Sequence, residues 1–428
     1  MARRRYVLVT LCRHSWGRAE LALRIARAIR ARGDEVHLLV TRSLGPLVRE
    51  AGCTFTEVHD QAGALAPMLL KALVVERRAT CVLHCDLVNN LDFVARAGVA
   101  PERLLIDGVR TIQVDVWDLN RTGIVADVFG DERRALVYGD SAVALRTLKQ
   151  VPARLIPSPI VSPVEAPERF ASLPARRRSS ARERRPVPLG LSSRDRLVLF
   201  CTARWQHRLT RHPKARAVAQ LLPRVLVHYF RRLSPRVVLA HVGPAPLAAA
   251  VRADLGARYR WLGQLGVQDF DAVLARTHLH VSANASATVI GKALVQEVPT
   301  LLLDGSDDRD QDGAPVVALS PPLRRIVGSA RPLYPFWLWP LGCRRFLSPV
   351  LADNPLLQAV LALGWLDEEA VVDAMDRTLF DPGAADDLRQ RQQRYVRRVR
   401  ALPGPADALE RSLHEGPFPA MCAGLGPT

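Results

Sequence analysis

The stretch VSANASATVIGKALVQEVPTLLL (281–303) joins a run of small side chains to a helical pattern and then to a second apolar run. Small residues at 284–288 would let a ligand approach the backbone. The following helix would offer unpaired N–H groups and the positive end of its dipole. This combination is typical of phosphate sites, and Lys292 adds a point charge that suits a phosphate. The alternatives are a tight strand-to-helix turn without a ligand and a solvated lysine on a helix surface.

A loop of this kind must follow a buried strand, and the chain contains a series of strand–helix–strand units. The apolar run at 6–12 predicts a first strand. A helix over 19–33 follows, with Leu21, Ile25 and Ile29 at four-residue spacing and a final glycine. Further strands are predicted at 35–41, 81–85, 103–107 and 135–139, with a helix from Ser141, and then at 196–204, 236–243, 259–263, 278–283 and 299–303. This alternation predicts α/β architecture with parallel sheets.

Proline-rich sequence from residue 157 and the arginine-rich stretch ARRRSSARERRP (175–186) interrupt the alternation. We therefore predict a Rossmann-like domain over 1–156, a Pro/Arg-rich linker over 157–195 and a second Rossmann-like domain over 196–428. A length of 428 residues fits two domains. Sheets of this type bind ligands at the carboxyl ends of their strands, so the loops that follow strands are the expected sites.

The net charge of +18 invites a nucleic-acid hypothesis, but the basic residues are spread along the whole chain. Only four of the 60 basic residues are lysines, and the one dense patch has the composition of a linker. We therefore expect no nucleic-acid partner. The charge favours anionic substrates or contact with a membrane surface.

The N-terminal run MARRRYVLVTLC begins like a signal peptide, but its apolar part is short and meets RHSW instead of a cleavage site. We interpret it as a strand and expect a cytoplasmic protein, because no run reaches the ~18–20 apolar residues of a membrane span. The seven cysteines are scattered without zinc-site spacing, so we expect reduced, mostly buried thiols and no metal site.

The segment from Trp261 to Leu303 resembles the nucleotide-sugar-binding half of GT-B glycosyltransferases, enzymes with two facing Rossmann-like domains around a cleft. It contains a glycine-bearing turn after a strand (Gly263), a small-residue loop, a helix and a proline-led strand. The helix ending RARGDEV and the closing stretch LFDPGAADDLRQRQQRYVRRVRALPGP are also similar to that family. The similarity covers nearly the whole chain and points to natural-product or cell-envelope enzymes.

The resemblance implies catalytic residues in the first domain. His14 lies two residues past the first strand, where inverting relatives keep a histidine general base. Asp86, at the end of CVLHC, matches the aspartate that orients it; such a histidine needs a carboxylate to fix its tautomer. His84 and Asp107 are alternatives at neighbouring predicted strand ends, and His14 as an ordinary loop residue stays open.

The resemblance also implies a donor site. Its members are Gly17, Arg18, Arg204, Gly263, Ser282, Asn284, Ser286, Thr288 and Lys292. Retaining relatives carry two glutamates eight residues apart where this chain has Asn284 and Lys292, and Glu297 stands where a glycine is usual. A lysine can only donate, so it suits the diphosphate and not the ribose hydroxyls.

The function implied by the resemblance is a metal-independent transfer of a sugar from a nucleoside diphosphate donor to a small acceptor held by the first domain, with no cofactor beyond the donor itself. An epimerase or coupling enzyme on the same fold and a non-catalytic GT-B activating partner are the alternatives. The aromatic stretch RPLYPFWLWPLG (331–342) is either a lid facing the acceptor or a packed loop.

Overall fold

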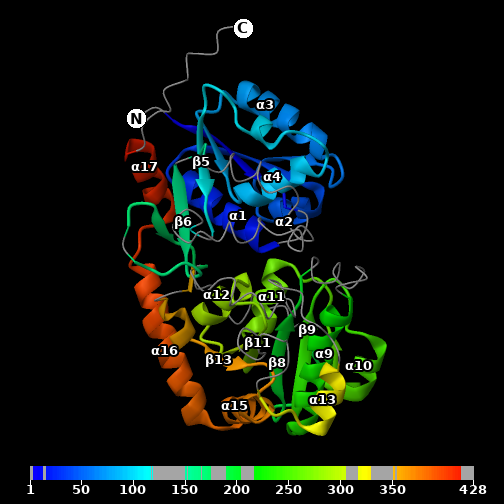
Figure 1. Ribbon diagram of the computed structural model, residues 1–428. Coiled ribbons are helices and arrows are strands. Elements are labelled where there is room, and N and C mark those ends of the chain that lie inside the picture. Colours follow the sequence, from blue (N-terminus) through cyan, green and yellow to red (C-terminus); the bar gives the residue numbers. More distant parts are fainter. Residues whose placement is uncertain are drawn as a thin grey trace.

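Two parallel β-sheets, each covered by helices, build two lobes in the computed structural model (Figure 1). The structure describes residues 3–12, 16–116, 118, 150–151, 153–164, 166–174, 189–203, 216–304, 317–328, 350–351 and 354–415. The first lobe contains the strands β1–β7, and the second contains β8–β13.

The first sheet has the strand order β3-β2-β1-β4-β5-β6-β7. Its strands are β1 (Arg5–Thr10), β2 (Glu35–Thr41), β3 (Phe55–Val58), β4 (Cys81–His84), β5 (Arg110–Val114), β6 (Arg154–Ser158) and β7 (Arg169–Ala171). Its helices are α1 (Trp16–Ala31), α2 (Gly45–Glu50), α3 (Ala66–Glu76) and α4 (Leu87–Ala95), with 3₁₀ turns η1 (Arg42–Leu44), η2 (Gly63–Leu65) and η3 (Pro101–Leu104). The strand order reverses between β1 and β4, and in this fold class a ligand site lies beside such a reversal.

The second sheet has the order β10-β9-β8-β11-β12-β13 and reverses between β8 and β11. Its strands are β8 (Arg196–Cys201), β9 (Val237–Val242), β10 (Tyr259–Trp261), β11 (Leu279–Ser282), β12 (Thr300–Asp304) and β13 (Leu361–Gly364). Its helices are α9 (Arg216–Arg232), α10 (Ala249–Leu255), α11 (Val267–Leu274), α12 (Thr288–Val295), α13 (Pro321–Val327), α15 (Glu368–Phe380) and α16 (Pro382–Arg400), with η4 (Gly256–Arg258) and η5 (Pro355–Gln358). The last helix is α17 (Pro405–Glu415).

Most predicted strands are confirmed, including the N-terminal run, which forms β1 at the centre of the first sheet. The prediction of a strand at 103–107 is wrong. Pro101 opens the turn η3 there, and the strand β5 begins only at Arg110. The strand and helix predicted at 135–139 and from Ser141 lie outside the described residues.

The first sheet continues past residue 157, where the linker was predicted to begin. The strand β6 contains Pro157, and β7 pairs with it in parallel through Pro157 and Phe170. A proline has no N–H to donate, so this strand does not read as one in the sequence. The described part of the segment thus belongs to the first lobe up to β7, and the arginine-rich stretch lies outside the described residues.

The chain returns to the first lobe at its C-terminal end. Helix α16 runs along the second lobe, and α17 packs against α1, β6 and β7 (Figure 1). Arg4 and Arg32 form ion pairs with Glu410 and Asp407 of α17, and Arg110 donates to the backbone at its end. The last helix, predicted as part of the second domain, therefore stabilises the first.

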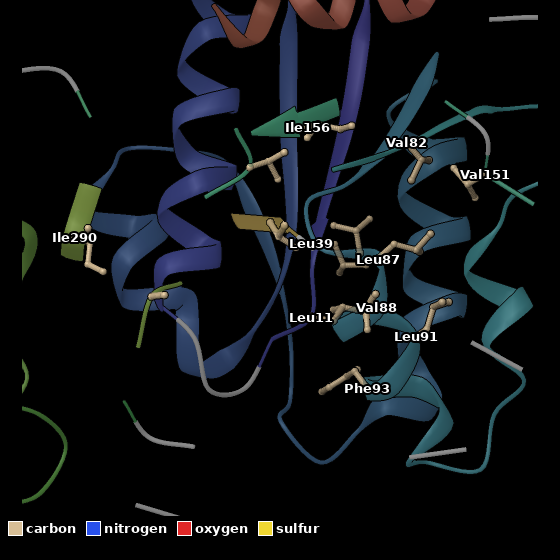
Figure 2. Packing of buried hydrophobic residues seen from close by; sticks show 14 of the residues in the cluster. Leu11, Leu39, Val82, Leu87, Val88, Leu91, Phe93, Val151, Ile156 and Ile290 are labelled. Atoms are coloured by element: carbon tan, nitrogen blue, oxygen red, sulfur yellow. The ribbon is translucent and has the colours of Figure 1, made fainter. Parts of the chain in front are cut away.

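One apolar cluster extends from the first sheet into the second lobe. It includes Val9, Leu11 and Val82 of the first lobe together with Ile290 and Leu294 of α12. Ile290 also lines a cavity shared with Leu21 of α1, and Figure 2 shows Ile290 beside the first-lobe helices. Burial of these side chains joins the two lobes along α1 and α12.

Candidate functional site

The carboxyl end of the first sheet holds Asp86, which lies two residues after the end of β4 and directly before α4. Its side chain caps α4 by accepting the N–H of Asn89 at 3.2 Å, and it also accepts the Asn89 amide at 2.6 Å. The Nε atom of Arg18 lies 2.8 Å from Asp86 Oδ2, with both side chains nearly buried. Asp86 and Arg18, predicted for catalysis and for donor binding, are therefore partners of each other.

The loop that follows β1 is anchored by a buried amide. Leu11 N–H donates to Asn90 Oδ1 at 2.7 Å, and the Asn90 amide donates to Val9 O and to His84 Nδ1, each at 3.1 Å. On the other side, the Thr41 hydroxyl donates to Cys12 O at 3.0 Å. The backbone is thus fixed up to Cys12. His14 itself lies outside the described residues.

The two alternatives to this arrangement do not fit the structure. His84 is fully buried, and burial lowers its pKa to about 4, so it is neutral and cannot reach a substrate. Asp107 precedes β5, at the amino end of the sheet and away from the expected site. Neither residue is therefore a base at the carboxyl edge.

In the second lobe, the small-residue loop lies at the carboxyl end of β11, as predicted. Asn284 Oδ1 accepts the Ser286 N–H at 2.9 Å and the Ser286 hydroxyl at 2.8 Å, and the Ser282 hydroxyl donates to Asn284 O. Helix α12 then begins at Thr288, and its N-cap residue Ala287 provides no side-chain hydrogen bond. The start of α12 therefore presents backbone N–H groups without a side-chain cap.

Lys292 is not a solvated lysine. Its side chain is 8% exposed, and Nζ lies 2.8 Å from Glu20 of α1 and 3.5 Å from Asp271 of α11. The ammonium also lies 4.9 Å from the centre of the Phe270 ring. The ammonium is thus already paired with two carboxylates, and a diphosphate would have to share it with them.

The starts of α1 and α12 meet across the two lobes. A Cβ atom added to Gly17 would lie 2.5 Å from both Oγ1 and Cγ2 of Thr288. The cavity beside this contact is lined by Gly17 and Arg18 of α1 and by Thr288 of α12. The structure thus brings together three of the residues predicted for the donor site.

A further aromatic residue, absent from the predicted set, lies at the same edge of the second sheet. Trp261 ends β10 and is 45% exposed, while its indole N–H donates to Gly243 O at 3.1 Å. The next turn passes through Gly263, whose φ of +68° favours glycine. The signal in the sequence was a tryptophan directly before this glycine turn.

Behind Trp261, a buried polar chain joins three strand ends. His241 is fully buried; its Nε2 lies 2.8 Å from the Thr202 hydroxyl and its Nδ1 lies 2.8 Å from the Tyr259 hydroxyl. Thr202 begins the loop after β8. Arg204 in this loop and the aromatic stretch 331–342 lie outside the described residues.

The cysteines that the structure describes have free thiols. Four of them are buried and Cys201 is partly buried. Burial raises the pKa of Cys81 and Cys85 to about 12, so these thiols act as small apolar groups. The described residues also contain no cluster of His, Cys, Asp and Glu side chains that could hold a metal ion.

A family of unknown function (DUF6365) has a sequence model that matches residues 25–419. The chain belongs to this family. No curated protein matches this chain. Among the described residues, no helix has the length and apolar content needed to cross a membrane.

Similar solved structures agree on one fold. The glycotransferase of kitacinnamycin has 16% identity and a TM-score of 0.55, and covers 96% of this chain and 100% of its own. The spinosyn rhamnosyltransferase SpnG, complexed with thymidine diphosphate, has 15% identity, a TM-score of 0.52 and coverages of 96% and 99%. A protein assigned as a UDP-N-acetylglucosamine 2-epimerase from Listeria monocytogenes has 13% identity, a TM-score of 0.53 and coverages of 91%. The predicted GT-B fold is confirmed.

Proposed function

We propose that this member of the family is a glycosyltransferase, which moves a sugar from a nucleoside diphosphate donor to a small acceptor without a metal ion. The observation that carries the proposal is the meeting of the small-residue loop and the uncapped start of α12 with the start of α1, beside the order reversals of both sheets. We further propose that it acts in the cytoplasm.

The donor diphosphate would bind at the loop of Asn284 and Ser286 and at the first turn of α12. Backbone N–H groups and the helix dipole would stabilise the negative charge that grows on the leaving diphosphate. The hydroxyl of Thr288 and the guanidinium of Arg204 would add donors there. Small side chains matter because they let phosphate oxygens reach the backbone.

Trp261 would provide the face on which the nucleobase stacks, next to the turn at Gly263. Its indole N–H is held by Gly243 O, so the ring orientation is fixed before a ligand arrives. Stacking of a base on an aromatic ring contributes about 1–3 kcal/mol, or about 5- to 160-fold in affinity.

The acceptor would lie against the first lobe, with His14 as the general base. The Asp86 carboxylate already accepts from Arg18 and Asn89. A carboxylate has room for a further hydrogen bond, so Asp86 can hold Arg18 and also orient the imidazole. Arg18 at the cleft would attract the anionic donor.

The first test is a thermal-shift screen of nucleoside diphosphates and their sugars. A ligand at 100 times its Kd should stabilise the protein by about 2.7 kcal/mol. Calorimetric titration of Trp261→Ala should then show a nucleotide affinity weaker by about 5- to 160-fold. The matched control is Phe380→Ala, since Phe380 is an exposed aromatic residue at the end of α15, and its loss should leave the affinity unchanged.

The second test addresses the chemistry. His14→Ala should lower kcat by roughly 10²–10⁴ on a hydroxyl acceptor while donor binding is retained. Turnover within a few-fold of the wild type would remove His14 as the base. If no nucleotide or nucleotide sugar stabilises the protein, the glycosyltransferase proposal fails as a whole.

A nucleotide-sugar epimerase is the second candidate, because the Listeria protein shares the fold over 91% of both chains. Analysis of the sugar after incubation without an acceptor distinguishes the two. An inverted carbon in the sugar would favour an epimerase, whereas transfer that requires an added acceptor would favour the glycosyltransferase.

A further inference from the structure

A group of four charged side chains lies between the two lobes. Glu20 of α1 pairs through Oε1 with Lys292 of α12 at 2.8 Å and through Oε2 with Arg24 at 3.3 Å. Asp271 of α11 lies 3.5 Å from Lys292 on its other side. Two positive and two negative charges balance, so the group is neutral as a whole.

Burial makes the pairing within this group important. The Lys292 side chain is 8% exposed, and those of Glu20 and Arg24 are 18% and 19% exposed. Arg24 also donates to the carbonyl of Ser172, and burial lowers its pKa. A buried ion pair adds little net stability, but removing one partner leaves an uncompensated charge and is costly.

The ion pair of Glu20 and Lys292 lies close to the proposed donor site. Glu20 lies one helical turn after Gly17 on α1, and Lys292 lies one turn after Thr288 on α12, so each pair shares a helix face. Ile290 and Leu294 belong to the apolar cluster that extends into the first lobe, and apolar burial has no preferred direction. The charged pair adds a directional contact directly behind the meeting point of the two helix starts.

We propose that Glu20 is a positioning residue: through Lys292 it holds the start of α1 in register with the start of α12 and keeps the site closed before a donor binds. The catalytic part of this inference rests on the proposed function, since α12 is the donor helix there. Lys292 then acts between the lobes and does not contact the diphosphate.

Small-angle scattering without ligand tests the structural part on the full-length protein. Glu20→Gln leaves Lys292 incompletely compensated, so the lobes should separate or shift to hydrate it, and the radius of gyration should increase. The double variant Glu20→Gln/Lys292→Met removes both charges and should return towards the wild-type value. The matched control is Asp373→Asn, which breaks an exposed ion pair with Arg377 and should change nothing.

Kinetics test the positioning part. Glu20→Gln should lower kcat about tenfold or more through misalignment, with a smaller change in the donor KM, and the double variant should recover part of this loss. Unchanged scattering and unchanged kcat for Glu20→Gln would overturn the inference. A loss of diphosphate affinity in Lys292→Met as large as the loss in kcat would also overturn it, because Lys292 would then be a ligand.

The two proposals fail separately. A scattering change in Glu20→Gln without any nucleotide-sugar turnover by the wild type would support the closure by Glu20 and contradict the glycosyltransferase. Turnover by the wild type with unchanged scattering and kinetics in Glu20→Gln would support the glycosyltransferase and contradict the closure by Glu20.

Discussion

The carboxyl edges of the two sheets have the same topology but different chemistry. At the first edge, charged and amide side chains bind one another: Asp86 holds Arg18, and Asn90 holds the backbone at Leu11. At the second edge, the loop before α12 consists of small residues, and Trp261 is exposed at the end of β10, three strands away along the same edge. Side chains are fixed at one edge, and backbone is accessible at the other.

This difference suggests a division of labour. An accessible backbone with a helix start suits an anionic group whose charge is spread over several oxygens. A fixed set of side chains suits a proton transfer, which needs one group at one place. The second edge is thus the better candidate for the donor and the first for the acceptor and its base.

The largest expected effect follows from a substitution at the point where the start of α1 meets the start of α12. Gly17→Ala would place a Cβ atom 2.5 Å from Oγ1 and Cγ2 and 3.1 Å from Cβ of Thr288, so the Thr288 side chain must turn or the start of α1 must move away from α12. A displacement of about 1 Å at a reacting centre can cost about 100-fold. We expect a loss of that size in kcat/KM with the fold retained, measured by steady-state kinetics and circular dichroism.

Two variants control for this effect. Thr288→Ala in the Gly17→Ala background removes the two nearest atoms and should recover part of the activity. Gly291→Ala changes a glycine on the same face of α12, where the new atom would meet Leu173 at an ordinary 3.5 Å, and should keep the activity. A Gly17→Ala enzyme as active as the wild type would show that the helix starts do not set the site.

A smaller effect is expected at the fixed edge. Asn90→Ala leaves the buried N–H of Leu11 and the buried ring nitrogen Nδ1 of His84 without this partner, whereas Val9 O keeps the N–H of Cys85. Each such group costs about 1–3 kcal/mol, so we expect a clear fall in the unfolding midpoint together with lower activity. Asn89→Ala is the control, because Asn89 is only partly buried and its side chain donates to Asp86, which keeps its bonds to Arg18 and to the Asn89 backbone N–H. Equal midpoints for the two variants would contradict the role of Asn90 as the anchor.

The sequence predicts the fold well because its signals are local. Buried strands such as β1 are continuous apolar runs, and α1 shows its four-residue spacing directly. The errors lie where local signals compete. Residues 103–107 contain a short apolar run that follows Pro101, and β6 contains a proline yet lies inside the sheet.

The site was less predictable, because its contacts join distant parts of the chain. The small-residue loop was visible as a pattern, and its place at the end of β11 followed from the topology. The partners of Lys292 on α1 and α11 were not visible, since no local pattern links residues so far apart. The sequence likewise gives no sign that Asp86 and Arg18 pair, although it predicts both as site residues.

The smallest expected effect concerns the far end of the donor helix. Glu297 follows α12 with φ of +59°, a conformation that favours glycine. Its carboxylate accepts the Gln393 amide at 2.9 Å, which offsets part of the backbone strain. Glu297→Gly removes the strain and the hydrogen bond together, whereas Glu297→Ala removes only the hydrogen bond.

We therefore expect Glu297→Gly to be more stable than Glu297→Ala by about 1 kcal/mol, the usual penalty of a left-handed non-glycine residue. Urea unfolding of the two variants measures this difference. Activity should stay at the wild-type level in both, because Glu297 lies at the opposite end of α12 from the loop. A loss of activity in Glu297→Gly alone would mean that the strained turn, and not only the start of the helix, sets the position of the donor edge.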